Sequence, residues 1–509
     1  MTKTLASLLA EPVPGLRLVR GDASTVVHSV AHDSRAVGSG SLFVAVPGFK
    51  SDGHAFLGPA VAAGAGALLV QEDHVASLPE LPDTVALIAA PSSRLALSAV
   101  AAWFYGHPSR EMTVIGVTGT DGKTTTSHLL TSVLESAGLS VGRLGTVDVH
   151  RTGQTMASES RMTTPEAPDV HRELRAMADA GCRYAIVEST SHGLALQRLE
   201  DVDYDMAVMT NITGDHLDFH ETFEQYRAAK ARLFEMLDRP SAKEMPKAAI
   251  VNADDPSAEH CLAQTSAQAI RFALDTPDVD VMARDVTLRS DGSGFELVTP
   301  IGSANVELHL PARFNVANAL AAAAAGYALG FAPTVIAKGL ESCPGVPGRM
   351  ERIVAGQPFE VVVDYAHTGD ALRKILEVLR VVTSGRLIVV AGAAGERDPG
   401  RRFGVGRAAA DGADYAVFTS EDPRSEDPGE IVAEIGRHAE AAGRVRGRDF
   451  VEVEDRREAI RHAVSVARSG DVVAICGKGH ERSIIFGDTT LPWDDRQVAR
   501  EELVAAGYA

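Results

Sequence analysis

The stretch MTVIGVTGTDGKTTTSHLLTSVLESAG, residues 112–138, decides the fold of the middle of this chain. It begins with an apolar run that is typical of a buried strand, and its second half has apolar residues at helical spacing. The segment GTDGKT between them predicts a loop that binds phosphates through its backbone N–H groups and Lys123, with Thr124 available to Mg²⁺. The loop is a variant, because the strict motif would have glycine in place of Val117.

Further strand-like runs follow this stretch. Three of them, YAIVES, DMAVMTN and AAIVNAD, occupy residues 184–189, 205–211 and 248–254. Buried strands that alternate with helices are typical of a parallel sheet covered on both faces. A break rich in proline and glycine at residues 344–348 precedes four more such runs, which predict a doubly wound, Rossmann-like domain. We therefore predict an α/β protein of three domains: residues 1–107, a central P-loop-type parallel-sheet domain at 108–345, and a C-terminal domain at 346–509.

The composition limits the classes of function. The chain has 509 residues, a formal net charge of -19 and a sequence pI of about 5.4. General affinity for nucleic acid or for an anionic membrane surface needs a basic excess, so we expect neither partner. The first residues are too short an apolar run for an export signal, which favours a cytoplasmic protein.

One uncharged stretch, residues 316–337, is long enough to cross a bilayer. Much of it is alanine, Asn318 lies inside it and Pro333 interrupts it. These features predict a buried helix followed by a break, so we expect no membrane insertion.

Two polar residues lie at the ends of predicted strands of the central sheet. Glu188 ends the run YAIVES, where a lone buried carboxylate is costly, and His216 follows the run DMAVMTN. The carboxyl ends of parallel strands meet at the edge where ligands bind. Each residue alone could be a satisfied polar residue at a strand end, but together with the loop they favour a Mg²⁺–nucleotide site.

A series of motifs in fixed order resembles the ATP-dependent Mur ligases, and within that family the MurE type. The resemblance covers nearly the whole chain and rests on GTDGKTTT, VESTSHGL, TNITGDHLDFH, YRAAKARLF, ARFNVANALAA, PGRMERI, VDYAHTGDAL, EDPRSEDP and CGKGHE. It implies that the three domains bind a UDP-linked substrate, ATP and an amino acid, in that order. The implied reaction belongs to peptidoglycan synthesis. ATP phosphorylates UDP-N-acetylmuramoyl-L-alanyl-D-glutamate on its γ-carboxylate, and a diamino acid displaces phosphate from the acyl phosphate.

The resemblance also implies roles for single residues. Lys230 matches a lysine whose carbamate holds a second Mg²⁺; without the resemblance it is a surface helix lysine. The implied catalytic residues are Lys123, Glu188, His216 and Lys230, and the metal ligands are Thr124, Glu188, His216 and Lys230. The implied ATP-binding residues are Gly119, Thr120, Asp121, Gly122, Lys123, Thr124, Thr125, Asn315, Asn318, Arg349 and Asp364. The implied ligands of the UDP-linked substrate are Ser34, Arg35, His54, Thr163, Thr164, Ser191 and Arg198.

The identity of the added amino acid rests on two loops. Arg424 offers a fork for the distal carboxylate of meso-diaminopimelate, and Glu481 is available for its ammonium. Asp422 acts in the opposite direction and favours L-lysine or L-ornithine, which end in an ammonium alone. We favour meso-diaminopimelate narrowly. The implied amino-acid-binding residues are Asp422, Pro423, Arg424, Gly477 and Glu481.

Two other functions remain open at this point. A folylpolyglutamate synthase-like ligase also extends a γ-glutamyl carboxylate, but the EDPR and GKGHE motifs argue against it. A nucleotide-dependent regulatory switch is a third interpretation, and a guanine-specific one would carry an NKxD motif, which the chain lacks. We expect the protein to act as a monomer.

Overall fold

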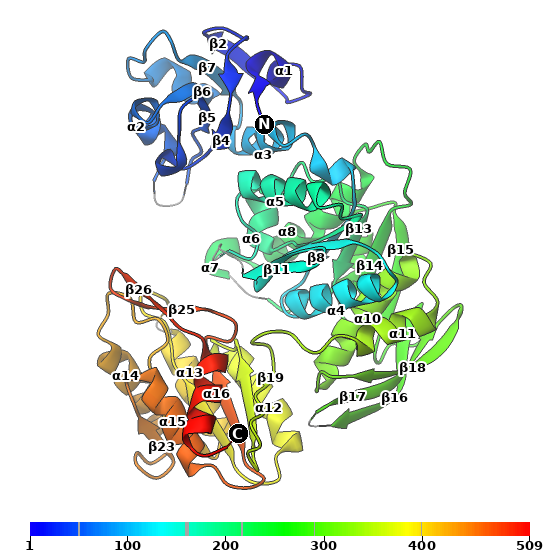
Figure 1. Cartoon of the computed structure of the whole chain (residues 1–509), viewed down its shortest axis with the longest axis vertical. Coiled ribbons are helices and arrows are strands. Elements are labelled where there is room, and N and C mark those ends of the chain that lie inside the picture. The colour runs from blue at the N-terminus through cyan, green and yellow to red at the C-terminus, as the bar shows by residue number, and fades with distance from the viewer. Residues whose placement is uncertain (49–50, 158–161, 215–216, 290, 399, 509) are drawn as a thin grey trace. The chain divides into compact units, whose positions relative to one another are not determined.

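The computed structural model describes residues 1–48, 51–157, 162–214, 217–289, 291–398 and 400–508 (Figure 1). The chain forms two compact units. The first contains residues 1–285 and the second contains the chain from Cys343 onward, while the segment between them contributes short pieces to both. The domain boundaries predicted at 107/108 and 345/346 stay predictions.

The N-terminal part is built on a sheet of short strands. Strands β4 to β7 pair in parallel, and β2 pairs antiparallel with β7. The sheet order is β2 (Arg17–Arg20), β7 (Ala86–Ala90), β6 (Ala65–Gln71), β5 (Ser41–Val44) and β4 (Ser29–Ala31). The helices are α1 (Leu5–Leu9), α2 (Leu57–Ala62) and α3 (Ser93–Phe104).

Helix α3 connects this part to the next. It begins at the N-cap Ser92, whose side chain accepts a hydrogen bond from the backbone N–H of Leu95. Its apolar side closes a core that also contains Ala167, the first residue of α5 (Ala167–Asp179). The N-terminal sheet and α5 therefore share buried surface.

The central sheet has the predicted parallel strands at its heart. Strand β8 lies between β12 and β13. The strands β9, β12, β8, β13, β14, β15 and β16 lie side by side in this order, and each pairs with the next in parallel. Strands β10 and β11 continue the sheet beyond β9 as an antiparallel edge. The order is β11 (Gln154–Ala157), β10 (Asp148–Arg151), β9 (Val141–Leu144), β12 (Tyr184–Glu188), β8 (Thr113–Thr118), β13 (Met206–Met209), β14 (Ala248–Asn252), β15 (Gln268–Ala273), β16 (Val281–Arg289), β17 (Gly292–Thr299) and β18 (Gly302–Leu308).

Helices connect these strands (Figure 1). Helix α4 starts directly after the glycine loop that follows β8, as the sequence predicted. The helices of this part are α4 (Lys123–Ser136), α5, α6 (Ser191–Ala195), α7 (Leu217–His220), α8 (Phe223–Glu235), α9 (Ala258–Leu262), α10 (Arg313–Ala328) and α11 (Pro333–Glu341).

The uncharged stretch at 316–337 folds as predicted. It forms most of α10, then a break, then the start of α11 at Pro333. The alanines at 321–325 are fully buried within the protein. Among the described residues, no helix combines the length and the apolar character that a membrane span requires.

The C-terminal sheet confirms the predicted doubly wound domain. Alternate residues of its strands face two separate cores, so that Val389 contributes to the core with α12 to α14, and Ile388 to the core with α15 and α16. The order is β19 (Glu351–Arg352), β20 (Glu360–Asp364), β24 (Val472–Cys476), β21 (Leu387–Ala391), β22 (Tyr415–Phe418) and β23 (Phe450–Glu452). The helices are α12 (Gly369–Val382), α13 (Gly400–Gly412), α14 (Pro428–Ala441), α15 (Arg456–Val466) and α16 (Asp495–Ala505); β25 (Ser483–Phe486) and β26 (Thr489–Pro492) form a separate hairpin.

Candidate active site

The glycine loop after β8 needs glycine at two positions. Gly119 and Gly122 have φ angles of 151° and 84°, which side chains rarely tolerate. A Cβ atom on Gly119 would collide with the hydroxyl of Thr210, and one on Gly122 would collide with the side-chain amide of Asn318. Asn318, a predicted ATP residue, therefore lies against the loop. The bare backbone at these positions allows a ligand to approach closely.

Two residues after β13 hold the loop in place, and sequence reasoning did not single them out. Thr210 donates its hydroxyl to the carbonyl of Asp121 at 2.6 Å. The backbone N–H of Asp121 donates to the side-chain oxygen of Asn211 at 3.0 Å, and the side-chain amide of Asn211 donates to the carbonyl of Asp121 at 3.1 Å. Their position at the carboxyl end of a strand beside β8 was the available signal.

Two lysines converge on this loop. The Nζ atom of Lys123 donates to the carbonyl of Gly119 at 2.7 Å and to that of Thr120 at 2.9 Å. The Nζ atom of Lys230, on α8, also donates to Gly119 at 2.7 Å and lies 4.6 Å from the ring centroid of Tyr226. Lys230 is 2% exposed, so the sequence-only interpretation as a surface lysine is wrong. Two ammonium groups at one carbonyl provide positive charge for phosphate oxygens.

Glu188 lies beside the start of α4, as predicted from its place at the end of β12. It is 1% exposed. One carboxylate oxygen accepts hydrogen bonds from the hydroxyls of Thr124 at 3.0 Å and Thr146 at 2.8 Å, and the other accepts from the amide of Thr146 at 3.3 Å. Thr146 was missed because a threonine after a strand is a common turn residue.

The surroundings of Glu188 fit a bound cation. Within the described part of the chain, its partners are neutral hydroxyl and amide donors, and no lysine or arginine forms an ion pair with it. A buried carboxylate without a counter-ion is costly, and Mg²⁺ prefers oxygen ligands such as Glu188 and Thr124. His216, the other predicted ligand, lies outside the described residues.

Four predicted ligands of the UDP-linked substrate surround the same strand end. The hydroxyl of Thr163 bonds that of Thr146 at 2.9 Å, and the hydroxyl of Thr164 donates to the carbonyl of Glu188 at 2.8 Å. Arg198 donates to the carbonyl of Thr164 at 3.0 Å. Ser191, the first residue of α6, is buried and follows β12 closely in the sequence. Two predicted ATP residues lie close by in the sequence of the glycine loop: Thr120 in the loop itself and Thr125 in the first turn of α4.

The remaining predicted ligands of this substrate, Ser34, Arg35 and His54, lie in the N-terminal part. The guanidinium of Arg35 is largely exposed and pairs with Asp33 at 2.6 Å. The hydrogen bond from Arg35 lowers the pKa of Asp33 to about 2. Arg35 thus already has a carboxylate partner, which a ligand must displace or share.

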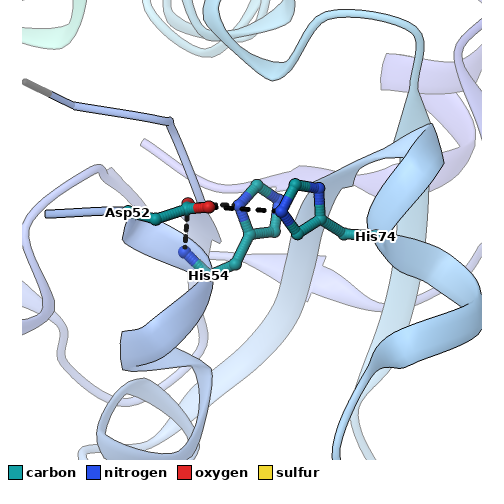
Figure 2. Close-up of side chains that lie close together, drawn as sticks. All are labelled: Asp52, His54 and His74. Atoms are coloured by element: carbon teal, nitrogen blue, oxygen red, sulfur yellow. Dashed lines mark hydrogen bonds and ion pairs between the residues drawn. The ribbon is translucent and has the colours of Figure 1, made fainter.

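Figure 2 shows the rings of His54 and His74 side by side, with Asp52 to one side of both. Both histidines contact the carboxylate of Asp52, at 2.6 Å and 3.2 Å, and the potential ligand atoms of the three side chains lie within 4.8 Å of one another. His54 also accepts a hydrogen bond from the backbone N–H of Gln71, so its other ring nitrogen carries the proton given to Asp52.

This cluster does not fit a shared metal ion. The two imidazole rings are stacked, with centroids 3.8 Å apart and an angle of 12° between their planes. A ring nitrogen donates its lone pair in the plane of its ring, so one ion cannot lie in both planes. The cluster instead fastens the turn at His54 to the end of β6 through Gln71.

Two predicted nucleotide residues lie at the start of the C-terminal sheet. Asp364, at the end of β20, accepts hydrogen bonds from the backbone N–H of Met350 at 2.7 Å and of Ala366 at 2.8 Å. The guanidinium of Arg349 lies 4.7 Å from the ring centroid of Tyr365. Asn315, another implied ATP-binding residue, donates its side-chain amide to the carbonyl of Pro311 at 2.7 Å.

The loops predicted to bind the amino acid meet around Lys478, which is fully buried. Its Nζ atom lies 2.8 Å from the carboxylate of Asp422 and 2.5 Å from that of Glu481. The same oxygen of Asp422 accepts the backbone N–H of Ile485 at 2.9 Å. Lys478 belongs to the motif CGKGHE but was not predicted as a site residue, because only the fold brings it close to Asp422. The two carboxylates therefore share one buried cation.

Arginines also gather in this region. Burial, and then the neighbouring guanidinium groups of Arg424 and Arg401, lower the pKa of Arg397. Arg397, which follows β21, was not singled out from the sequence. Arg424 has a φ angle of 56°. Its backbone N–H donates a hydrogen bond to the carbonyl of Ile485, in β25, at 3.1 Å. Three cations close together are suited to binding an anion.

Glu421 is the unexpected member of this region. It is 6% exposed, and its Oε2 atom is buried with no hydrogen-bond partner among the residues that the structure describes. Burial raises the pKa of Glu421 to about 7, against the opposing charges of Lys478 and Arg456. Gly477 lies against it, since a Cβ atom there would approach the Glu421 carboxyl at 3.6 Å. Pro423, the other predicted residue, is buried beside them in the chain.

Comparisons with known proteins cover nearly the whole chain. The family model described as "Mur ligase family, catalytic domain" matches residues 26–105. "Mur ligase middle domain" matches residues 117–326, and "Mur ligase, glutamate ligase domain" matches residues 348–479.

Curated relatives match over similar lengths. The chain is 46% identical over 490 residues to a UDP-N-acetylmuramyl-tripeptide synthetase of Roseiflexus sp. (strain RS-1), with 95% of each chain covered. It is 40% identical over 511 residues to a UDP-N-acetylmuramoyl-L-alanyl-D-glutamate--2,6-diaminopimelate ligase of Geobacillus kaustophilus (strain HTA426), covering 99% of this chain and 100% of the relative.

Solved structures show the same architecture. A UDP-N-acetylmuramoyl-L-alanyl-D-glutamate--2,6-diaminopimelate ligase matches with a TM-score of 0.66 and 30% identity over 100% of both chains. A folylpolyglutamate synthase of Mycobacterium tuberculosis matches with a TM-score of 0.62, but at 19% identity and over 75% of this chain, so it shares the fold alone.

Proposed function

Because this chain belongs to the Mur ligase family, we propose that it joins meso-2,6-diaminopimelate to UDP-N-acetylmuramoyl-L-alanyl-D-glutamate, with ATP, in peptidoglycan synthesis. The names of relatives at about 40% identity support this choice of substrates. Residues 1–107 would bind the uridine end, residues 108–345 would bind ATP, and residues 346–509 would bind the amino acid.

The observation that carries the nucleotide part of the proposal is the buried Glu188 beside a glycine loop with two lysines. Lys123 neutralises charge on the terminal phosphates of ATP and orients them. Glu188 and Thr124 would hold Mg²⁺, and Lys230 would join them once its amine is carbamylated. When bound, Mg²⁺ offsets the negative charge that phosphoryl transfer redistributes.

The reaction then has two steps. The γ-carboxylate of the D-glutamyl residue attacks the γ-phosphorus of ATP, which releases ADP and leaves an acyl phosphate. The amine of the incoming amino acid attacks the acyl carbon, the carbon–oxygen bond to phosphate breaks, and the amine loses a proton to give the amide. Thr163, Thr164, Ser191 and Arg198 bind the oxygens of the UDP-linked substrate next to Glu188.

The arrangement around Lys478 supports meso-diaminopimelate as the added residue. Lys478 offsets charge on Asp422 and Glu481, so Asp422 repels a substrate carboxylate less than it would alone. Arg424 and Arg397 remain as cations for the distal carboxylate. L-lysine and L-ornithine are the second candidates, because carboxylates still outnumber the ammonium on Lys478.

An amine-dependent phosphate-release assay tests the proposal. Purified protein receives ATP, Mg²⁺ and UDP-N-acetylmuramoyl-L-alanyl-D-glutamate, and then each of the three amino acids. We expect phosphate release to require both the UDP-linked substrate and an amino acid, with the highest kcat/KM for meso-diaminopimelate. ATP hydrolysis that ignores both substrates would refute the ligase function, and a preference for lysine or ornithine would refute the choice of amino acid.

A further inference from the structure

Three charged side chains form a chain of ion pairs next to the substrate residues. Arg94 lies in the first turn of α3, Glu166 is the N-cap residue of α5, and Arg198 follows α6. The distance from Arg94 Nη1 to one oxygen of Glu166 is 3.5 Å, and that from Arg198 Nε to the other oxygen is 2.9 Å. The side chains are 22%, 14% and 12% exposed, so solvent screens these pairs only partly.

Besides Glu166, the two arginines contact backbone carbonyls of different segments. Arg94 donates to the carbonyl of Pro47 at 3.3 Å, at the base of the turn that leads to His54. Arg198 donates to the carbonyl of Thr164 at 3.0 Å. The hydroxyl of Thr164 in turn donates to the carbonyl of Glu188 at 2.8 Å. A continuous set of polar contacts therefore runs from the N-terminal turn to the strand end at Glu188.

The charges in this chain of contacts are unequal. One carboxylate serves two guanidinium groups, so one positive charge is left over. Burial lowers the pKa of Arg198, the charge of Glu166 raises it, and the charge of Arg94 lowers it further. Without Glu166, two partly buried cations would face each other and separate.

We propose that Arg94 and Glu166 are positioning residues that hold the guanidinium of Arg198 toward the anionic part of the UDP-linked substrate. This inference rests on the proposed function, because it uses that substrate as the ligand. An arginine fork binds phosphate or carboxylate oxygens best when its orientation is fixed in advance. One oxygen of Glu166 forms an ion pair with Arg198 at Nε, without hydrogen-bond geometry at that atom, and the other oxygen pairs with Arg94.

Charge and position predict opposite results for one substitution. Glu166→Gln removes a negative charge next to Arg198, so electrostatics alone predicts tighter binding of an anion. The positioning role predicts weaker binding, because the two arginines then repel each other. We expect Glu166→Gln to weaken binding of UDP-N-acetylmuramoyl-L-alanyl-D-glutamate roughly tenfold in calorimetry. Unchanged or tighter binding would overturn the inference.

Arg94→Lys is the second variant. It keeps the charge but loses the fork that contacts Pro47 and Glu166 together. We expect a rise of about fivefold in KM for the UDP-linked substrate, with kcat and the KM for ATP unchanged. An equal loss in the ATP parameters would show a general structural role and overturn the inference.

The exposed pair Arg17 and Glu72 offers a matched control in the same compact unit. Arg17→Lys and Glu72→Gln make the same chemical changes away from the contacts described, and we expect no change in substrate binding. Wild-type protein that fails to bind the UDP-linked substrate would refute the proposed function itself. Wild-type binding with equal binding by Glu166→Gln and Arg94→Lys would refute only the positioning roles.

Discussion

The phosphate-loop region and the region around Lys478 both collect charged side chains, but they compensate charge in opposite ways. At the phosphate loop, Glu188 is bonded by neutral donors in the described structure, and Lys230 donates to a backbone carbonyl. In the C-terminal region, Lys478 is already paired with Asp422 and Glu481. Among the described residues, the buried Glu188 of the first region has no cationic partner, whereas Lys478 of the second has two carboxylate partners.

This difference separates two tasks. A buried carboxylate such as Glu188 gains much from a ligand that brings a cation to it, as a metal–nucleotide complex does. A region that contains its own counter-ions gains less from any one ligand and discriminates between similar ligands through a small remaining charge. We therefore expect substitutions at the phosphate loop to abolish activity, and substitutions around Lys478 to change stability or preference.

The largest effect is expected for Lys123→Ala. Its ammonium is the cation that the loop offers to the terminal phosphates, so turnover should fall on the order of 10³-fold. Binding of the UDP-linked substrate should stay nearly unchanged, because Lys123 is not among its predicted ligands and the predicted uridine contacts, Ser34 and Arg35, lie in the N-terminal part. Steady-state kinetics and calorimetry on the same variant measure both quantities. Equal loss of both would show that the two sites are not separate.

Lys230→Ala comes next. If a carbamate on Lys230 holds Mg²⁺, activity should fall roughly 10²-fold and recover in part when a short carboxylic acid fills the gap. Lys338→Ala, at an exposed lysine of α11, is the control and should keep full activity. Ordinary activity in Lys230→Ala would remove this residue from the site, even though it contacts the loop.

The same two regions differ in how far the sequence predicted them. The phosphate loop was predicted from contiguous residues, and Glu188 from its place at the end of a strand of the same sheet. Lys230 was implied by the family resemblance alone, because its neighbours in the sequence predict only a surface helix lysine. Thr146 was missed because its partner Glu188 lies on a strand that only the sheet order brings beside it.

The C-terminal region was predicted less completely. Asp422 was recognised as a charge that disfavours a substrate carboxylate, but its compensation by Lys478 depends on two loops that are distant in the sequence. The burial of Glu421 is likewise a property of the packed domain. Charge balance between loops requires the three-dimensional structure, whereas strand and loop order follow from hydrophobic patterns.

Glu421→Gln tests the C-terminal region through stability. The folded-state pKa of Glu421, about 7, exceeds the ordinary value of 4.5, so the folded state retains a proton that the unfolded state has lost between these pH values. The free energy of unfolding of the wild type therefore falls as pH rises from about 4.5 to about 7. Glu421→Gln has no carboxyl group to ionise, so its free energy of unfolding does not fall in this way. At pH 8 it should exceed that of the wild type by up to about 3 kcal/mol.

Denaturant unfolding at pH 5 and pH 8 measures this effect. The chain has two tryptophans, and a Trp103→Phe background leaves Trp493 to report on the C-terminal domain. Glu377→Gln, at an exposed position of α12, is the control. A variant that shows the same pH dependence as the wild type would mean that Glu421 is ionised in the folded protein.

The smallest effect, on amino-acid preference, tests the C-terminal region most directly. Asn in place of Asp422 keeps a side-chain oxygen for the bonds from Lys478 and Ile485 but removes the negative charge. Lys478 then has Glu481 as its remaining carboxylate partner among the contacts described, and the region becomes more positive. A distal carboxylate is stabilised by that change and a bare ammonium is not. We therefore expect Asp422→Asn to raise the ratio of kcat/KM for meso-diaminopimelate to that for lysine roughly tenfold, or about 1.4 kcal/mol. Asp488→Asn makes the same charge change at an exposed position of the β25–β26 turn and should leave the ratio unchanged. An unchanged or lower ratio in Asp422→Asn would mean that the negative charge of Asp422 does not oppose the distal carboxylate of meso-diaminopimelate.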